Sequence, residues 1–370
     1  MRTRGAVLRE AGTEYDIVDL EVVDPGPGEV LVEMAFAGLC HSDEHLRHAN
    51  AGGRYPIVGG HEGSGVVAAV GPGVTSVQPG DHVVTSFLPS CGHCRWCATG
   101  RSNLCDAGAT IATGQLPTGT FPFRLDGEPL GGFCMIGAFA ERTVLSEYSC
   151  VKIDPWVPLD AAALTACSVP TGWGSAVYSG GVRAGDAVVV VGLGGVGVNA
   201  VQGAKHAGAS FVVGVDPVAM KREFATRLGA THTAPDAREA ADLVRELTWG
   251  AGADVVVLTV GKLDAATTRA AVRCVGKGGT LVLTALADIP TDVTVELLGN
   301  PLTVFEQRIQ GSLFGSCNPF RDIPRLVRMA DRGELELASL ITRRYSLEQV
   351  NEGQRDQLAG ETIRGLLVHG

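Results

Sequence analysis

Residues 187–201, AVVVVGLGGVGVNAV, decide the fold of the second half of this 370-residue chain. One alanine and four valines make a continuous apolar run, which is typical of a strand buried on both faces of a parallel sheet. A G-x-G-x-x-G pattern follows the run and opens a predicted helix, where glycines permit a tight turn and let backbone N–H groups reach a pyrophosphate. The predicted cofactor-binding residues of this loop are Gly192, Gly194, Gly195, Val196 and Gly197.

An acidic residue completes the predicted dinucleotide site. Asp216 closes the strand-like segment FVVGVD, nineteen positions after Gly197. A carboxylate at this place accepts hydrogen bonds from the adenosine ribose and repels a 2′-phosphate, so the sequence favours NAD over NADP. Lys221 is expected to flank the same ribose. The alternative is a glycine-rich turn with an aspartate that caps a helix before Pro217.

Strands and helices alternate along the rest of this half. Strand-like segments at 211–216, 253–261 and 279–287 are separated by helical ones, which predicts an α/β fold with a doubly wound parallel sheet. The first 150 residues instead read as short strands divided by the turns PGPG, GPG and PGD, a pattern typical of a β-rich domain. We expect the Gly/Pro-rich connector 113–137 to be a surface excursion from that domain.

Composition narrows the function classes. The formal net charge of −10 argues against nucleic acid or an anionic membrane as a partner. The N-terminal segment MRTRGAVLRE lacks the apolar region of a signal peptide, and apolar runs such as 187–201 are too short to span a bilayer. Ten cysteines without an export signal predict a cytoplasmic protein whose thiols bind metal.

Four of these cysteines lie within one polar stretch, CGHCRWCATGRSNLC. Their Cys-x2-Cys-x2-Cys-x7-Cys spacing lets four thiolates converge on one tetrahedral Zn²⁺ with no open position, which describes a structural site. The alternatives are an iron–sulfur cluster and cysteines that form disulfides or remain free thiols. The predicted ligands are Cys91, Cys94, Cys97 and Cys105.

Taken together, these motifs resemble the zinc-dependent, medium-chain alcohol dehydrogenase family over nearly the whole chain. The matching landmarks are GHE at 60–62, the four-cysteine lobe at 90–106, GLGGVG at 192–197 and TIRGLL at 362–367. Within the family, KIDP, VPTGWGSA, VDPVAMKRE and ITRRY resemble the bacterial NDMA-dependent enzymes, called nicotinoproteins. The resemblance implies a GroES-like catalytic domain over 1–168, a Rossmann domain over 169–310, and a return to the catalytic domain over 311–370. It also implies a homodimer or homotetramer, with an edge strand for dimerisation within 294–311.

The resemblance further implies a catalytic zinc held by Cys40, His61 and Cys167, with a fourth position for water or alcohol. Glu62 is expected to approach the ion transiently, and Asp43 to accept the ring N–H of His61. Ser42 and His45 are expected to relay the proton of the alcohol, with His48 as an alternative to His45.

Other positions are expected to bind the cofactor and substrate. In the family a basic residue, often arginine, contacts the pyrophosphate where this chain has His41, and Arg364 matches a second phosphate contact. Thr171 lies in the matching cofactor segment VPTG. Ser168 replaces the glycine that many relatives have after the cysteine ligand. Phe87 is expected to line the alcohol pocket.

The expected activity is reversible hydride transfer between a primary alcohol and NAD at a zinc ion, with two zinc ions per chain. An alternative is a thiol-dependent formaldehyde dehydrogenase that acts on a hydroxymethyl adduct. A non-catalytic NAD-binding protein would be expected to lose part of the site, whereas this chain keeps every position. A zinc-free quinone reductase is disfavoured by both cysteine sets.

Overall fold

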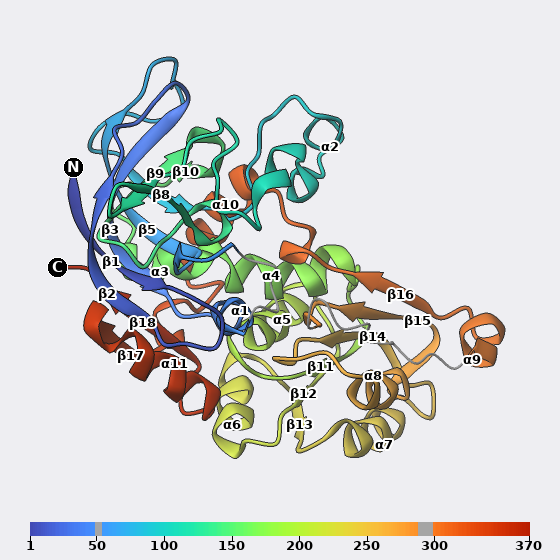
Figure 1. Cartoon of the computed structure of the whole chain (residues 1–370). Coiled ribbons are helices and arrows are strands. Elements are labelled where there is room, and N and C mark those ends of the chain that lie inside the picture. The colour runs from blue at the N-terminus through green and yellow to red at the C-terminus, as the bar shows by residue number, and fades with distance from the viewer. Residues whose placement is uncertain (49–53, 288–298) are drawn as a thin grey trace. The chain divides into compact units, whose positions relative to one another are not determined.

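The structure is a computed structural model that describes residues 1–48, 54–287 and 299–370 (Figure 1). These residues form two units. Unit 1 comprises 1–167 and 318–370, and unit 2 comprises 168–317. The chain returns to unit 1 at Asn318, later than the expected residue 311. The last residue of unit 2 contacts the start of that unit, since the Cys317 thiol donates to the Pro170 carbonyl at 3.3 Å.

Unit 2 is built on a six-stranded parallel sheet with the order β13-β12-β11-β14-β15-β16. The valine run forms its central strand, which is buried throughout. The strand order reverses between β11 and β14, as in a doubly wound dinucleotide-binding sheet. This confirms the predicted fold class. The strands are β11 (Ala187–Val191), β12 (Phe211–Val215), β13 (His232–Ala234), β14 (Ala253–Leu258), β15 (Val275–Leu283) and β16 (Arg308–Gly311).

Helices connect the strands of unit 2. Two of them approach closely because of a glycine: a Cβ on Gly172 of α4 would lie 2.0 Å from the carbonyl oxygen of Val196 in α5. The helical segments are α4 (Ser168–Gly174), the π-helical turn η6 (Ser175–Ser179), α5 (Gly195–His206), α6 (Ala219–Leu228), α7 (Ala237–Leu247), α8 (Ala265–Val272), α9 (Gly299–Val304) and the short turn η7 (Phe314–Ser316). Of the segment expected to dimerise, residues 294–298 lie outside the described residues.

Unit 1 contains a seven-stranded sheet with the order β10-β6-β5-β3-β18-β17, and β9 pairs with β3. The strand β18, near the end of the chain, lies antiparallel to β3, which lies more than 300 residues earlier in the sequence. The strands are β3 (Glu29–Gly38), β5 (Glu62–Val70), β6 (His82–Thr85), β9 (Arg142–Ser146), β10 (Cys150–Lys152), β17 (Ile341–Ser346) and β18 (Arg364–Val368).

A closed barrel forms the rest of the β structure of unit 1 and corrects one expectation. Its order is β1-β2-β7-β8-β4, so the connector 113–137 supplies two of its strands and is not a surface excursion. Phe123 and Leu130 are almost completely buried in the core of the barrel, and burial of such side chains outweighs the turn-forming residues around them. The strands are β1 (Arg2–Leu8), β2 (Asp16–Val22), β4 (Ile57–Val58), β7 (Phe123–Leu125) and β8 (Glu128–Gly132).

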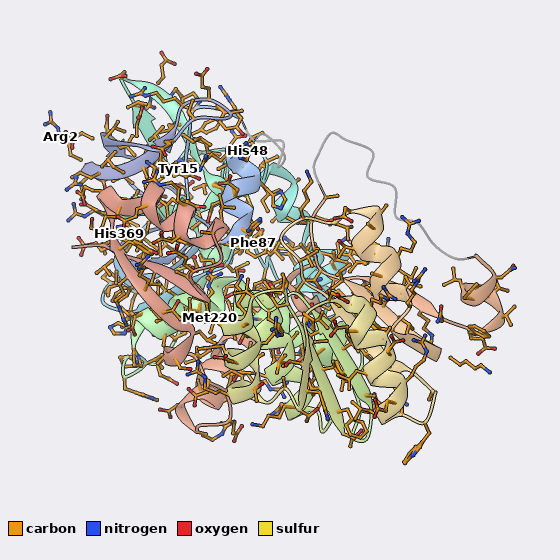
Figure 2. All side chains as sticks on the ribbon, turned by 90° about the horizontal axis from the view of Figure 1, so that it is seen from below. Arg2, Tyr15, His48, Phe87, Met220 and His369 are labelled. Carbon is orange, nitrogen blue, oxygen red and sulfur yellow. The ribbon has the colours of Figure 1, made fainter. Side chains whose placement is uncertain are left out.

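The helices of unit 1 cover the sheet and position the site. Figure 2 shows Tyr15 inside this unit and Arg2 at its edge, in agreement with their burial. None of the helices in the described residues is long and apolar enough to cross a membrane. The α-helices of the described residues in this unit are α1 (His41–Arg47), α2 (Arg95–Ala98), α3 (Leu159–Ala163), α10 (Pro319–Asp331) and α11 (Val350–Leu358), and its short helical turns include η3 (Phe133–Met135) and η5 (Leu164–Ala166).

Candidate functional site

Three elements of unit 1 bring a buried set of metal-binding side chains together. Cys40 precedes α1, His61 precedes β5, and Cys167 follows η5. With Glu62, these residues offer four ligand atoms that all lie within 4.8 Å of one another. Each side chain is at least nine-tenths buried. Residues separated by more than a hundred positions therefore meet at a single point.

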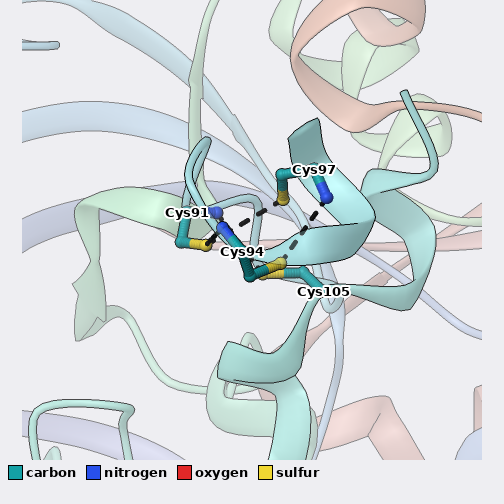
Figure 3. Close-up of side chains that lie close together, drawn as sticks. All are labelled: Cys91, Cys94, Cys97 and Cys105. Atoms are coloured by element: carbon teal, nitrogen blue, oxygen red, sulfur yellow. Dashed lines mark hydrogen bonds between the residues drawn. The ribbon is translucent and has the colours of Figure 1, made fainter. Parts of the chain in front are cut away.

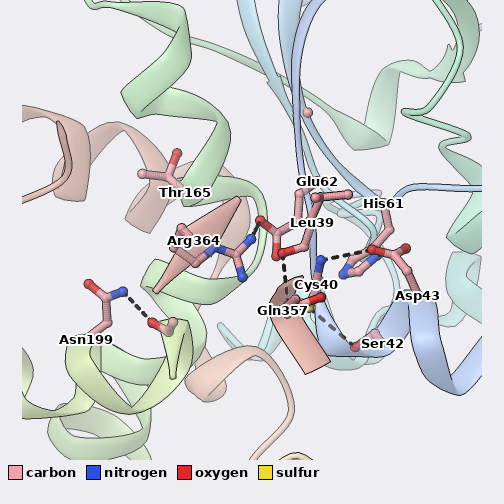
Figure 4. A network of polar contacts seen from close by, with 12 residues as sticks. Leu39, Cys40, Ser42, Asp43, His61, Glu62, Thr165, Asn199, Gln357 and Arg364 are labelled. Atoms are coloured by element: carbon pink, nitrogen blue, oxygen red, sulfur yellow. Dashed lines mark hydrogen bonds and ion pairs between the residues drawn. The ribbon is translucent and has the colours of Figure 1, made fainter. Parts of the chain in front are cut away.

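Asp43 holds two members of this set in place (Figure 4). One carboxylate oxygen accepts the backbone N–H of Cys40 at 3.0 Å, which caps α1, and the other lies 3.1 Å from Nδ1 of His61. Because Asp43 accepts the Nδ1 hydrogen, Nε2 is the ring nitrogen left to face a cation, which is a proton or a metal ion. That Nε2 atom is buried and has no hydrogen-bond partner among the described residues.

The charges of the set favour a cation. The hydrogen bond with Cys167 and the nearby His61 hold the pKa of Cys40 well below its usual range, against the effect of burial. Burial lowers the pKa of His61, but Asp43 and Cys40 outweigh it and raise that pKa well above its ordinary value. Two sulfurs and one imidazole nitrogen, the buried Nε2 of His61, are a donor set that fits zinc.

Glu62 and Arg364 form a buried ion pair behind this set. Burial raises the pKa of Glu62 to about 8, although the guanidinium opposes this shift. The pair requires a glycine on the neighbouring strand, since a Cβ at Gly38 would lie 2.3 Å from the Glu62 carboxylate. The sequence identifies both residues as site candidates but gives no sign that they bind each other.

The first turns of α1 carry the predicted proton relay. The Ser42 hydroxyl lies 3.7 Å from the Cys40 sulfur. The rings of His41 and His45 meet edge to face with centroids 5.7 Å apart, and His45 is buried. His48 lies further along α1, half exposed, with Nε2 2.7 Å from the Glu44 carboxylate. The structure thus gives the two candidate relay histidines different surroundings.

Two aromatic rings flank His61. The Phe87 centroid is 5.6 Å and the Phe133 centroid 5.3 Å from that of the imidazole, both nearly perpendicular to it. Such edge-to-face contacts fix the orientation of a ring. Phe87 is predictable from the sequence, whereas Phe133 is not, because it follows β8 in a segment whose composition indicates only turns.

The four-cysteine lobe forms a second cluster in unit 1 (Figure 3). The Sγ atoms of Cys91 and Cys97 are 4.0 Å apart, and those of Cys94 and Cys105 are 3.8 Å apart. Tetrahedral zinc with Zn–S bonds of about 2.3 Å requires sulfur–sulfur distances of about 3.8 Å. None of the four cysteines forms a disulfide, so the disulfide alternative is wrong.

Backbone N–H groups stabilise the thiolates of this lobe. The N–H of Cys97 points at the sulfur of Cys94, and this bond does most to lower the pKa of Cys94, to about 6. Further N–H groups lie 3.4 Å from the sulfurs of Cys91 and Cys105. Burial, by contrast, raises the pKa of Cys105 to about 12, so the thiolate form is favoured at Cys94 and the thiol form at Cys105.

The glycine loop of unit 2 has the geometry of a phosphate cradle. Gly192 has a φ of +94°, and a Cβ on Gly197 would lie 1.8 Å from the Gly192 carbonyl oxygen. A Cβ on Gly194 would meet nothing within 4 Å and would instead occupy the open space before α5. That space lies at the N-terminus of α5, where an anion is favoured.

Asp216 ties this loop to the end of β12. Its carboxylate accepts the N–H groups of Leu193 and Val218, both at 2.9 Å. Arg222 donates to the carbonyls of Asp216 and Pro217, a contact that the sequence analysis does not predict. Lys221 lies beside Arg222 on α6, partly buried. The glycine loop, Asp216 and the two basic residues at the start of α6 fit a dinucleotide.

Thr171 belongs to the same unit but to another element. It is buried in α4, directly before the glycine that contacts α5. Ser168, at the start of α4, is also buried. The structure therefore places both residues in α4, the helix that packs against α5, which follows the glycine loop.

Comparisons with known proteins agree with this geometry. The family model described as "Alcohol dehydrogenase GroES-like domain" matches residues 26–155, and "Zinc-binding dehydrogenase" matches 195–332. The NDMA-dependent alcohol dehydrogenase of Amycolatopsis methanolica is 55% identical over 369 residues, covering 100% of this chain and 99% of that protein. Alcohol dehydrogenase B of Mycobacterium tuberculosis is 45% identical, covering 99% and 98%.

Solved structures share the fold over their full length. Benzyl alcohol dehydrogenase from Acinetobacter calcoaceticus superimposes with a TM-score of 0.92 at 28% identity, covering 100% of both chains. An alcohol dehydrogenase zinc-binding domain protein from Burkholderia ambifaria also gives 0.92, at 33% identity and with 100% and 99% coverage. The chain therefore belongs to the zinc-dependent, medium-chain alcohol dehydrogenase family.

Proposed function

We propose that this protein oxidises primary alcohols to aldehydes, and catalyses the reverse reaction, by hydride transfer to and from NAD. The observation that carries the proposal is the buried cluster of Cys40, His61 and Cys167. Asp43 holds the imidazole of His61 through Nδ1, and the buried Nε2 atom has no hydrogen-bond partner among the described residues. When bound, zinc supplies a Lewis acid that lowers the pKa of the alcohol, and NAD supplies the hydride acceptor.

The residues around the cluster have separate tasks in this proposal. Cys40, His61 and Cys167 hold the ion, and the edge-to-face rings of Phe87 and Phe133 orient His61 and wall the alcohol site. Glu62 is held back by its ion pair with Arg364, from which it can turn toward the ion during ligand exchange. Aromatic walls favour an uncharged alcohol over the acidic adduct of a thiol-dependent formaldehyde dehydrogenase.

Proton removal falls to α1. Ser42, whose hydroxyl is close to the Cys40 sulfur, takes the proton of the alcohol, and His45 passes it to solvent. An imidazole suits this step because its charge changes near neutral pH. His41 and Arg364 are proposed to contact the phosphates of the cofactor, and Thr171 to bind its nicotinamide half.

The choice of cofactor rests on unit 2. Gly192, Gly194, Gly195, Val196 and Gly197 cradle the pyrophosphate in this proposal, and Asp216 and Lys221 take the adenosine ribose. Asp216 disfavours a 2′-phosphate, so NAD is the expected nucleotide. The 55% identity to an NDMA-dependent enzyme supports the nicotinoprotein branch, in which NAD(H) stays bound and is recycled in place.

Assembly and location complete the proposal. Among the described residues, β16 is the last strand at one edge of the unit 2 sheet, and extension of the sheet across a two-fold axis would give a homodimer, or a homotetramer built from dimers. Ten cysteines outside any disulfide, six of them in two candidate metal clusters, fit a reducing cytoplasm.

The test uses one substitution and one matched control. Cys40→Ala is expected to abolish alcohol turnover and to remove one zinc ion per chain, but to leave nucleotide binding intact. Cys274→Ala changes a buried thiol of unit 2 outside both clusters and should keep turnover and both ions. Turnover that survives Cys40→Ala would refute the proposal.

A denaturation assay tests the nicotinoprotein branch. The purified protein is unfolded, and the supernatant is assayed for NAD(H) and zinc together. About one nucleotide and two zinc ions per chain are expected. Nucleotide-free protein that turns over with added NAD would identify an ordinary exchanging dehydrogenase instead.

A further inference from the structure

A cluster of five hydroxyl groups lies in unit 2, outside the residues discussed so far. Ser175 is completely buried and lies at its centre, 2.9 Å from both Thr284 and Ser312. Ser179 continues the cluster, 2.8 Å from Ser312 and 2.9 Å from Ser316. Four segments of the chain thus contribute to one chain of hydroxyl–hydroxyl hydrogen bonds.

The donor and acceptor of each of these hydrogen bonds can be assigned by starting from the hydrogen bond between Ser175 and the backbone. Ser175 lies 2.6 Å from the carbonyl oxygen of Thr171, which can only accept, so Ser175 donates its single hydroxyl hydrogen there. Thr284 and Ser312 must then donate to Ser175. By the same reasoning Ser179 donates to Ser312. Every hydrogen in the cluster therefore points inward.

The outer members of the cluster consequently present only lone pairs. Ser316 gives its hydrogen to Ser179, and Thr284 gives its hydrogen to Ser175. Both outer residues are partly exposed. An outside group that binds here must donate a hydrogen bond, so the cluster suits an N–H group and repels an anion.

The position of the cluster in the sheet identifies the donor. Thr284 follows β15 and Ser312 follows β16, so both stand at the carboxyl ends of parallel strands, where ligands of such sheets bind. Asp216, proposed to hold the adenosine ribose, ends β12, on one side of the glycine loop. The other half of the dinucleotide must extend over β14, β15 and β16. Its terminal group, the carboxamide of nicotinamide, carries an NH₂ donor.

We propose that Thr284, held by Ser175 within this hydroxyl cluster, binds the carboxamide NH₂ of the nicotinamide. This inference rests on the proposed use of NAD and adds a binding residue for the nicotinamide end. Thr284 contacts the cofactor, and Ser175 acts as a positioning residue. The contact also contributes to holding the nucleotide in the site.

The test compares three nucleotides by calorimetry on the full-length, zinc-loaded protein, after any nucleotide that it already holds has been removed. Thr284→Val, which keeps the side-chain shape, should weaken NADH binding about tenfold, as expected for one hydrogen bond whose donor is left unpaired. ADP-ribose lacks nicotinamide, and its affinity should stay unchanged. In 3-acetylpyridine adenine dinucleotide a methyl group replaces the NH₂, so the substitution should not weaken binding of the oxidised analogue.

Two further variants complete the design. Ser175→Ala removes the hydroxyl that accepts hydrogen bonds from both Thr284 and Ser312. This variant should also bind NADH more weakly, while its affinity for ADP-ribose stays unchanged. Thr248→Val is the matched control, because its hydroxyl is hydrogen-bonded in the same unit but lies at the amino end of β14; all affinities should remain at the wild-type value.

Each other outcome overturns the inference. Equal loss of NADH and ADP-ribose in Thr284→Val would mean that the cluster only supports the fold, and unchanged NADH affinity would exclude the contact. Wild-type protein that binds neither NADH nor ADP-ribose would refute the proposed function itself. If wild-type protein binds both NADH and ADP-ribose and the variants bind them with wild-type affinity, only the contact with Thr284 is refuted.

Discussion

Replacing Asp43 with asparagine tests whether one carboxylate builds the buried metal cluster. In the structure Asp43 accepts two hydrogens, from the Cys40 backbone and from Nδ1 of His61. An asparagine offers one oxygen and one NH₂ group, so one of these N–H groups must face another donor. The imidazole then turns or changes tautomer, and Nε2 no longer presents its lone pair to the ion.

The expected magnitude follows from these two contacts. Loss of a residue that orients a metal ligand typically lowers metal affinity 10- to 100-fold, or about 1.4–2.7 kcal/mol. Competition with a chelator should therefore remove about one zinc ion per chain from Asp43→Asn at a concentration that leaves wild type loaded. Alcohol turnover should fall with the zinc content, while the four-cysteine lobe keeps its ion.

A second aspartate serves as the control. Asp236 caps α7 by accepting the N–H groups of Arg238 and Glu239, and asparagine caps helices equally well. Asp236→Asn should retain both ions and full turnover. Wild-type zinc affinity in Asp43→Asn would refute the reasoning, because it would mean that His61 needs no fixed acceptor.

Three further predictions concern the loop, the lobe and pH. Gly197→Ala should abolish NADH binding in a fluorescence titration but keep both zinc ions, since its Cβ would collide with Gly192; retained binding would contradict the cradle. Cys97→Ser should release the lobe's zinc and lower the thermal unfolding midpoint, while NADH affinity persists; unchanged zinc content would count against a four-thiolate site. Burial lowers the pKa of His369 from 6.5, so the unfolded state binds a proton first. The free energy of unfolding should therefore fall below about pH 6.5, by at most about 1.4 kcal/mol per pH unit; an equally steep decline in His369→Gln would exclude this origin.

Features that depend on neighbouring residues could be predicted from the sequence. The glycine loop lies within six positions, the four cysteines lie within fifteen, and each has a spacing that only a few structures explain. The valine-rich strands likewise reveal their burial by composition. In these segments the geometry is largely set by local backbone constraints.

Features that depend on residues far apart in the sequence could not be predicted. Glu62 and Arg364 are 302 residues apart and meet only because β3 lies between β5 and β18. The two strands within 113–137 are recognisable only once the barrel around them exists, because their turn-rich composition resembles that of a loop. Phe133 was missed for the same reason, since it meets His61 through barrel closure rather than through any motif.

The insertion of β18 beside β3 has a consequence for biosynthesis. Every described strand of unit 2 has been made once the ribosome has added Gly311, so that sheet can assemble during translation. The larger sheet of unit 1 cannot, because its penultimate member in the strand order is made only with residues 364–368. Until then the nascent chain carries Glu62 without the cation that later neutralises it.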